Sequence, residues 1–256
     1  MNVLFFYPYE KATYLEAYEY NRLEQKTVYF NFAIAMLSAV LKNAGHLVEL
    51  VAVRDYEEFK ETNIDIEIYD IIAFSYSEVE MSWIQEFTLK LKDMYPDKIQ
   101  IHGGVGPTLI PYEVFNSTGA DIVCIGEGEY AFLELLERLK NNESLIGIKN
   151  LFVKIKGQIY ESEIGQIVED LDSLPMYDFD LFDKYNLSNY VSNMPRLYYL
   201  GSRNCAFNCT FCSNHSKKKA MGLSNNKDYV RRFSPQRVIS DLIYMKNKYP
   251  KALMVQ

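Results

Sequence analysis

Strand-like and helix-like segments alternate through the first half of this 256-residue chain. Short apolar runs are separated by longer segments whose apolar residues recur at helical spacing, and this alternation predicts a parallel sheet with helices on both faces. Five parallel strands joined by crossover helices predict a flavodoxin-like (Rossmann-like), doubly wound α/β fold. The expected strands are residues 2–7, 47–53, 69–75, 99–102 and 121–125, and the expected helices are residues 31–43, 80–95 and 131–139.

The loops at the carboxyl ends of these strands are the predicted ligand site, because doubly wound sheets bind ligands there, near the point where the strand order reverses. Glycine in such a loop lets the backbone approach a ligand closely and exposes N–H groups. Any α/β sheet also needs glycine in its turns, so a purely structural explanation stays open. The residues at these ends are Tyr7, Pro8, Ser75, Tyr76, Gly103, Gly104, Gly106, Pro107, Gly126, Glu127 and Gly128.

Three of the four cysteines, Cys205, Cys209 and Cys212, lie in one short stretch with the spacing C-x-x-x-C-x-x-C. Thiolates are soft donors that favour zinc, copper(I) or an iron–sulfur cluster over hard cations. On a [4Fe–4S] cluster, three thiolates leave one iron open to a small molecule. His215 follows at a plausible spacing, so a structural Cys₃His zinc site is the alternative, although such sites usually take their ligand pairs from two separate elements.

The cysteine spacing, with Phe211 directly before the last cysteine, resembles the signature of the radical S-adenosylmethionine (SAM) enzymes. This resemblance implies that the three cysteines hold a [4Fe–4S] cluster, that SAM binds the open iron, and that Phe211 is a cofactor-binding residue. It also implies reductive cleavage of SAM to a 5′-deoxyadenosyl radical, with an electron donor such as a flavodoxin or ferredoxin. Residues 198–203 resemble the first barrel strand that leads into the cluster loop.

Residues 103–113 and 121–129 resemble the N-terminal cobalamin (B12)-binding domain of one large radical SAM class. The resemblance implies that cobalamin lies edge-on at the strand ends, above the cluster, and that the enzyme methylates or rearranges an unactivated carbon centre of an unknown substrate. The D-x-H-x-x-G motif that places a histidine on cobalt in other cobalamin proteins is absent from this sequence. Cobalamin is therefore expected to lack a histidine lower ligand.

Several single residues near the strand ends have structural interpretations. Cys124 lies in an apolar run, which predicts a buried core thiol. His102 has no neighbouring carboxylate to orient it as a ligand or base, so we interpret it as a structural histidine. His46 follows a helix end and is expected to face solvent or to cap that helix. Glu127 lies in a turn that could face a cofactor, whereas Glu129 fits the first turn of the next helix through the helix dipole.

The second half predicts a hairpin, a strap and the start of another fold. Residues 151–160 predict a hairpin that turns at residues 156–157. Residues 165–195 are too rich in aromatic side chains for a free linker and predict an ordered strap that packs across both parts. Ser234 and Pro235 predict a helix start, and residues 252–255 a strand.

The expected organisation has three parts: a cobalamin-binding-like α/β domain at residues 1–145, a hairpin and interdomain strap at 146–195, and an incomplete start of a radical SAM (β/α) barrel at 196–256. The family repeats the βα unit about six times, whereas this chain supplies β-α-β. We expect the remaining barrel to lie on another chain or to be lost, so that this chain binds cofactors without turning over.

Charge and hydropathy exclude some partners. The net charge of −7 argues against general affinity for nucleic acid or anionic membranes. The longest apolar stretch, residues 32–41, is too short to span a membrane, and the first residues lack the basic start of a secretory signal, so we expect a cytoplasmic protein. We interpret the lysine run at residues 217–219 as a solvated loop surface.

Two other classes of function remain to be compared with a radical SAM enzyme. One is a non-catalytic corrinoid-binding module with a vestigial or zinc-binding cysteine loop. The other is a flavodoxin-like electron carrier, which is disfavoured because the loop after Tyr7 lacks the Ser, Thr and Gly residues that cradle a flavin phosphate. Metal content separates the corrinoid-binding module from the enzyme, because iron with sulfide favours the enzyme and zinc favours the module.

Overall fold

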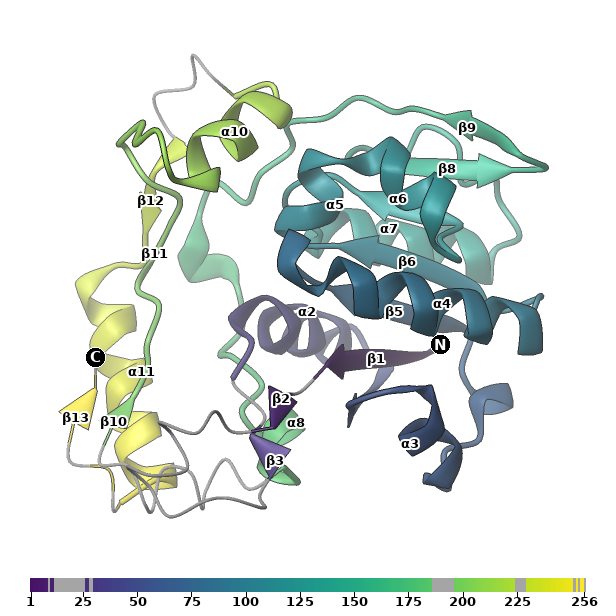
Figure 1. Cartoon of the computed structure of the whole chain (residues 1–256). Coiled ribbons are helices and arrows are strands. Elements are labelled where there is room, and N and C mark those ends of the chain that lie inside the picture. The colour runs from purple at the N-terminus through teal and green to yellow at the C-terminus, as the bar shows by residue number, and fades with distance from the viewer. Residues whose placement is uncertain are drawn as a thin grey trace.

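The computed structural model describes residues 1–8, 10–11, 26–27, 30–185, 196–223, 229–250, 252 and 254–255. In Figure 1 the sheet and its helices fill the right of the view, and a smaller part that carries α10 and α11 lies at the left. The main sheet has the strand order β4-β1-β5-β6-β7-β8-β9. Its parallel strands are β1 (Asn2–Pro8), β4 (Leu47–Val53), β5 (Ile71–Ser75), β6 (Ile99–Gly103) and β7 (Ile122–Cys124).

Numbered along the chain, these parallel strands run 2-1-3-4-5 across the sheet, which is the flavodoxin-like order. The predicted doubly wound fold is therefore confirmed. The order reverses at β1, whose two neighbours are β4 and β5. Ligands of such sheets bind beyond the carboxyl ends of the strands close to this position.

Helices cover both faces of the sheet because side chains alternate between faces along each strand. Val3 and Phe5 of β1 point into the apolar core under α2 (Phe32–Asn43) and α7 (Glu129–Lys140). Leu4 and Phe6 point into the opposite core, under α4 (Met81–Met94). Shorter elements around the sheet are β2 (Glu10–Lys11), β3 (Lys26–Thr27), α3 (Tyr56–Glu61), η1 (Ile66–Ile68), η2 (Glu78–Glu80), α5 (Val105–Leu109) and α6 (Pro111–Ser117).

The predicted hairpin forms, and it extends the main sheet. Strand β8 (Leu151–Ile155) pairs antiparallel with β7, and β9 (Gln158–Tyr160) pairs antiparallel with β8. Lys156 and Gly157 form the turn with φ of 49° and 82°, the left-handed geometry that tight hairpin turns require. The main sheet therefore has seven strands, and the sequence predicted the hairpin without indicating that it joins the five parallel strands.

A strap, residues 161–185, leads from the hairpin across the molecule and includes η3 (Leu171–Ser173) and α8 (Asp180–Asp183). Tyr177 packs edge-on against Phe32 of α2 on one side and against Tyr199 and Phe233 of the smaller part on the other. The aromatic packing predicted for residues 165–195 is present at Tyr177, while residues 186–195 of that range lie outside the described residues.

The strap also reaches the outer edge of the sheet through Tyr185. Its hydroxyl donates to the Leu50 carbonyl and accepts from the Ala52 N–H, each at 2.8 Å. Both backbone groups belong to β4, the strand at that edge. The Tyr185 side chain therefore satisfies two backbone groups on the outer side of β4, where the described main sheet has no further strand to pair with them.

The smaller part contains a β-α-β unit whose first strand differs from the predicted one. Strand β10 (Arg196–Leu197) pairs parallel with β13 (Met254–Val255), and α11 (Pro235–Lys248) lies between them in sequence. Ser234 caps α11, since its Oγ accepts from the Arg237 N–H at 3.1 Å, as predicted. None of the helices in the described ranges has the length and apolar character of a membrane span.

The expected single strand over residues 198–203 is wrong. Strand β10 ends at Leu197, and β11 (Ser202–Arg203) pairs antiparallel with β12 (Arg231–Arg232) instead. The chain changes its pairing partner between these two short strands, and a local sequence pattern does not encode that change. The cysteine loop and α10 (Ser213–Ala220) follow β11, so they lie between the two arms of the β11–β12 hairpin in sequence.

Candidate functional site

A cavity of about 440 Å³ lies beyond the carboxyl ends of the parallel strands. This volume falls within the range of about 300 to 1,000 Å³ that is usual for small-molecule sites. Three parts of the chain form its walls: the sheet domain with its loops, Tyr177 of the strap, and the segment from Leu200 to Asn204 of the smaller part. The cavity is therefore shared between the α/β domain and the segment that leads into the cysteine loop.

The inner end of the cavity is an apolar slot between the sheet and the helices on one face. Phe5, Ala73 and Ile101 contribute from the strands, while Leu37 of α2 and Phe132 of α7 contribute from the helices. Such a lining suits an uncharged, flat or aliphatic group.

Cys124 also lines the slot and is 6% exposed. Burial raises the pKa of its thiol to about 12, so the side chain stays protonated at neutral pH. The prediction of a buried core thiol is confirmed.

The glycine loops form the floor of the cavity mouth. Gly104 has φ of 98°, and a Cβ there would lie 2.6 Å from the Tyr76 carbonyl oxygen, so only glycine fits. The Thr108 hydroxyl joins two loops, because it donates to the Gly104 carbonyl at 2.7 Å and accepts from the Gly126 N–H at 2.9 Å. The predicted residues that line the cavity are Ser75, Gly103, Gly104, Gly126, Glu127 and Gly128.

The other predicted cofactor residues do not line this cavity. Tyr76 follows Ser75 and points to the opposite face, where its hydroxyl lies 3.0 Å from His102 Nδ1. Gly106 and Pro107 are buried within α5, and Phe211 is 92% exposed in the cysteine loop. The two remaining residues, Tyr7 and Pro8, end β1, and Tyr7 packs edge-on against Phe182 of α8.

The histidines near the sheet are structural in this arrangement. His102 is fully buried, and burial together with the charge of Lys154 lowers its pKa to about 3, so the ring is neutral. His46 lies at the surface end of α2, with its Nδ1 3.3 Å from the Met1 amino group. Neither ring lines the cavity, in agreement with the structural interpretation of both.

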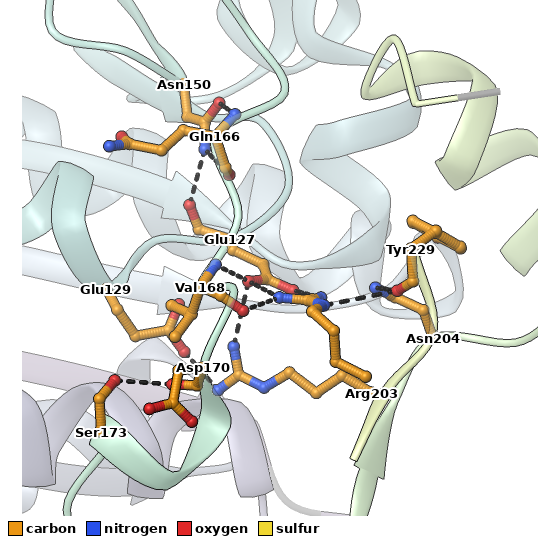
Figure 2. A network of polar contacts seen from close by, with 11 residues as sticks. Glu127, Glu129, Asn150, Gln166, Val168, Asp170, Ser173, Arg203, Asn204 and Tyr229 are labelled. Carbon is orange, nitrogen blue, oxygen red and sulfur yellow. Dashed lines mark hydrogen bonds and ion pairs between the residues drawn. The ribbon is translucent and has the colours of Figure 1, made fainter. Parts of the chain in front are cut away.

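Glu127 is the centre of a buried network of charges between the two parts of the molecule, drawn in Figure 2. Its carboxylate accepts from both terminal nitrogens of Arg231, one of them at 3.0 Å, and from the Val168 N–H at 2.9 Å. Arg203 adds an ion pair to Glu127 at 3.3 Å and donates to Glu129 Oε1 at 2.5 Å. Arg203 therefore bridges the two glutamates.

The two arginines face each other across the β11–β12 hairpin, where Arg203 and Arg231 form a cross-strand pair. The glutamates belong to the loop after β7 and to the start of α7. The network thus fastens the stem of the cysteine loop to the floor of the cavity. Asn150 supports the same loop, because its Nδ2 donates to the carbonyls of Glu127 at 3.0 Å and Gln166 at 2.7 Å (Figure 2).

The network also sets the charge states of its members. Burial alone would raise the pKa of Glu127, but the hydrogen bonds from Arg231 and the charges of Arg203 and Arg231 outweigh it and hold the pKa below the usual range. Burial acts to lower the pKa of Arg203, and the two glutamates reverse that effect and raise it. Glu127 and Arg203 are therefore both charged at neutral pH. Within the described part of the chain, Glu129 Oε2 is buried without a hydrogen-bond partner.

The three cysteines of the loop are free thiols, with Cys209 exposed and the other two half-buried. Within this loop the Cys212 N–H donates to the Cys209 carbonyl at 3.1 Å. Among the described residues, no group of three or more His, Cys, Asp or Glu side chains is arranged to hold a metal ion. His215 Nδ1 lies 3.4 Å from Asn208 Oδ1, and none of the three loop cysteines lines the cavity. The donors suit an iron–sulfur cluster chemically, but their sulfur atoms are not gathered around one point.

Among the lining residues that the sequence analysis missed are Arg203, Asn204, Asn214 and Lys217. We had interpreted Lys217 as part of a solvated loop, whereas it lies in α10 and is half-buried. Asn214 and Lys217 are three residues apart and therefore lie on the same face of that helix. This spacing was a usable signal, but α10 has no apolar periodicity that would have predicted a helix.

Comparison with known proteins agrees with this geometry. A family model for the B12 binding domain matches residues 22–136. An uncharacterized methyltransferase of Pyrococcus horikoshii is 32% identical over 131 residues, which is 50% of this chain and 26% of that relative.

Two solved structures share the fold. The radical SAM methyltransferase TsrM from Kitasatospora setae, solved with tryptophan substrate and a SAM analogue, gives a TM-score of 0.67 at 13% identity, covering 96% of this chain and 46% of that one. The cobalamin-dependent SAM radical enzyme OxsB, solved with aqua-cobalamin and SAM, gives 0.68 at 19% identity, covering 97% of this chain and 32% of that one.

The chain spans about a quarter of the curated relative and less than half of each solved structure. At these low identities the solved structures establish the fold, and the family model is a match to residues 22–136. The resemblance predicted from the sequence is confirmed at this level: residues 22–136 match the B12 binding domain model, and over nearly its whole length the chain has the fold of these two cobalamin-dependent or radical SAM structures.

Proposed function

We propose that this chain holds cobalamin in the cavity beside a [4Fe–4S] cluster bound by Cys205, Cys209 and Cys212, as the cofactor-binding portion of a radical SAM enzyme. One observation carries the proposal. The cavity at the strand ends is closed by the same segment, Leu200 to Asn204, that leads directly into the cysteine loop. A ligand in the cavity and a cluster in the loop would therefore be held by adjacent residues of one chain.

The cavity residues have distinct tasks in this proposal. The glycine loops let the backbone approach the ring edge of the corrinoid, and the apolar slot takes an uncharged group of the same ligand. None of the three histidines of the chain lines the cavity, so bound cobalamin would take no histidine ligand from it. Cobalamin would supply a cobalt centre able to carry a methyl group.

At the cluster loop, the chain supplies three soft thiolates and leaves one iron site for the amino and carboxylate groups of SAM. The half-buried cysteines and the salt-bridged stem through Arg203 would limit water access and fix the loop over the cavity. When bound, the cluster supplies the electron that cleaves SAM. Radical methylation or rearrangement of a substrate, and reduction by a flavodoxin or ferredoxin in the cytoplasm, are proposals for the longer proteins that this chain resembles.

Anaerobic reconstitution with iron and sulfide, followed by titration with aqua-cobalamin, tests both cofactors. We expect about four irons per chain with an absorption band near 400 nm, and loss of both in a variant with all three cysteines changed to alanine. That variant should keep its cobalamin affinity within about threefold, a change of less than about 1 kcal/mol, because none of the three loop cysteines lines the cavity.

A cavity-blocking variant tests the location of cobalamin. Ala33 lies at the exposed cavity rim, so Ala33→Trp should abolish cobalamin binding without loss of stability. Ala44→Trp, at the exposed far end of α2 and outside the cavity, is the matched control and should bind normally. Normal cobalamin binding by Ala33→Trp would show that the cavity is not the cobalamin site.

A non-catalytic corrinoid-binding module is the second candidate. It is favoured by the cysteine loop, in which the thiols are partly exposed and not gathered around a metal position. Stoichiometric zinc in place of iron, with cobalamin still bound, would support this module and exclude the radical reaction for this chain.

A further inference from the structure

Lys217 lies where a positive charge needs a partner that the chain does not supply. Its side chain lines the cavity mouth and is close enough to Glu127, Glu129, Arg203 and Arg231 to feel the charge of all four. Together these five side chains carry two negative and three positive charges. This group of five side chains therefore has an excess of one positive charge.

The two glutamates of this group are already paired with arginines. Glu127 is bound by Arg231 and Arg203, and Glu129 by Arg203. Within the described residues the Lys217 ammonium group forms no ion pair or hydrogen bond, although the backbone carbonyl accepts from the Met221 N–H. Burial lowers the pKa of its ammonium group, and this is the cost expected of a cation held away from water without a direct partner.

Asn214 stands beside Lys217 in the wall of the cavity. The two residues are three positions apart on α10 and share one face of the helix, and both line the cavity mouth. An amide N–H and an ammonium group on one wall present donors to a single oxyanion, whereas the opposite end of the cavity is apolar.

We propose that Lys217 and Asn214 form a subsite for a singly charged oxyanion of the bound cofactor. This inference rests on the proposed function, because the cavity must hold a cofactor. Two oxyanions meet the description: the phosphodiester of a complete cobalamin and the carboxylate of SAM. Either oxyanion would bring the summed charge of the five side chains and the bound group to zero, and it would pair directly with the Lys217 ammonium group.

The test measures dissociation constants for Lys217→Met by absorbance titration and calorimetry on the cluster-loaded chain. If the phosphodiester binds here, cobalamin affinity falls roughly tenfold or more, as for loss of a hydrogen bond to a charged group, and affinity for cobinamide, which lacks the phosphodiester, changes by less than about twofold. If the carboxylate binds here, SAM affinity falls by a similar factor while affinity for decarboxylated SAM does not.

Two further variants separate binding from folding. Lys217→Arg keeps the charge and should retain most of the affinity, and Lys219→Met, on the exposed side of the same helix, should bind like the wild type. The ligand-free Lys217→Met chain should have the same Tm or a higher one, because a buried unpaired charge is removed. A purely structural lysine would give a lower Tm.

Unchanged affinities for both cobalamin and SAM in Lys217→Met would overturn the inference while leaving the proposed function intact. A wild-type chain that binds neither corrinoid nor SAM would overturn the proposed function and the inference with it.

Discussion

The Glu127 side chain is only 8% exposed, and the charge of its carboxylate is balanced by two guanidinium groups and one backbone N–H. Breaking such a buried pair from one side leaves the opposite charges without a partner. We expect Glu127→Gln to lower the free energy of unfolding at pH 7 by about 3 kcal/mol. Urea unfolding measures this change, and Glu169→Gln, at an exposed site of the strap, is the control that should change little.

The same substitution has a predictable pH dependence. The folded protein holds the pKa of Glu127 below its usual value of 4.5, so the stabilisation is present above that pH and is lost as the pH falls through the folded pKa. The difference in Tm between wild type and Glu127→Gln should therefore shrink below pH 4.5. A difference that stays constant down to pH 3 would contradict the charged network.

His102 also makes the folded protein less stable in acid, but its effect begins at a higher pH than that of Glu127. Its ring stays neutral in the folded protein down to about pH 3, while the unfolded chain takes up a proton below about 6.5. Stability from this residue is therefore lost as the pH falls from 6.5 towards 3. His102→Gln should show a flatter decline of Tm over this range, and His215→Gln, at an exposed site, should keep the wild-type slope.

At the scale of elements, the strap joins the two parts through aromatic packing. Tyr177 is 3% exposed and donates to the Leu200 carbonyl at 3.2 Å. Tyr177→Ala should cost about 3 to 5 kcal/mol of unfolding free energy, whereas Tyr177→Phe, which loses only the hydroxyl, should cost about 1. Tyr130→Ala, at a side chain that is 43% exposed, is the control. Equal costs for the two Tyr177 variants would mean that the hydrogen bond, not the packing, holds the strap.

The elements also show what the sequence could predict. The helix expected at residues 31–43 forms as Phe32–Asn43, because Asn31 caps it and Gly45 ends it, and both signals are local. The pairing of β8 with β7 and the split of residues 198–203 were not predicted, since each depends on a distant partner strand.

The residues of the candidate site also divide into those that local sequence signals predict and those that depend on distant contacts. The glycine loops were predicted because strand ends and glycine are visible in the sequence, and six of the eleven loop residues named there line the cavity. Tyr76 was misplaced because its face depends on where β5 ends. The Arg231–Glu127 contact spans 104 residues, so nothing local indicated it.

At the scale of the whole molecule, the cavity belongs to both parts, so a ligand that fills it should stabilise both. Cobalamin at a hundred times its dissociation constant should add about 2.7 kcal/mol to stability. Hydrogen exchange should slow in α10 and in the loop after β7 together, while α3, which does not line the cavity, should be unaffected. Protection confined to the sheet domain would mean that the smaller part does not close the site.

The contact of Tyr185 with the outer strand has a consequence for solubility. An exposed strand edge is a template for pairing with another chain, and here one phenol hydroxyl occupies two of the backbone groups that such pairing would use. Because Tyr185 comes 132 residues after the end of β4 in sequence, that protection is absent from a newly made α/β domain until the strap has been synthesised and docked. During synthesis the chain therefore passes through a stage in which this edge can recruit a second, unfinished copy of the same protein.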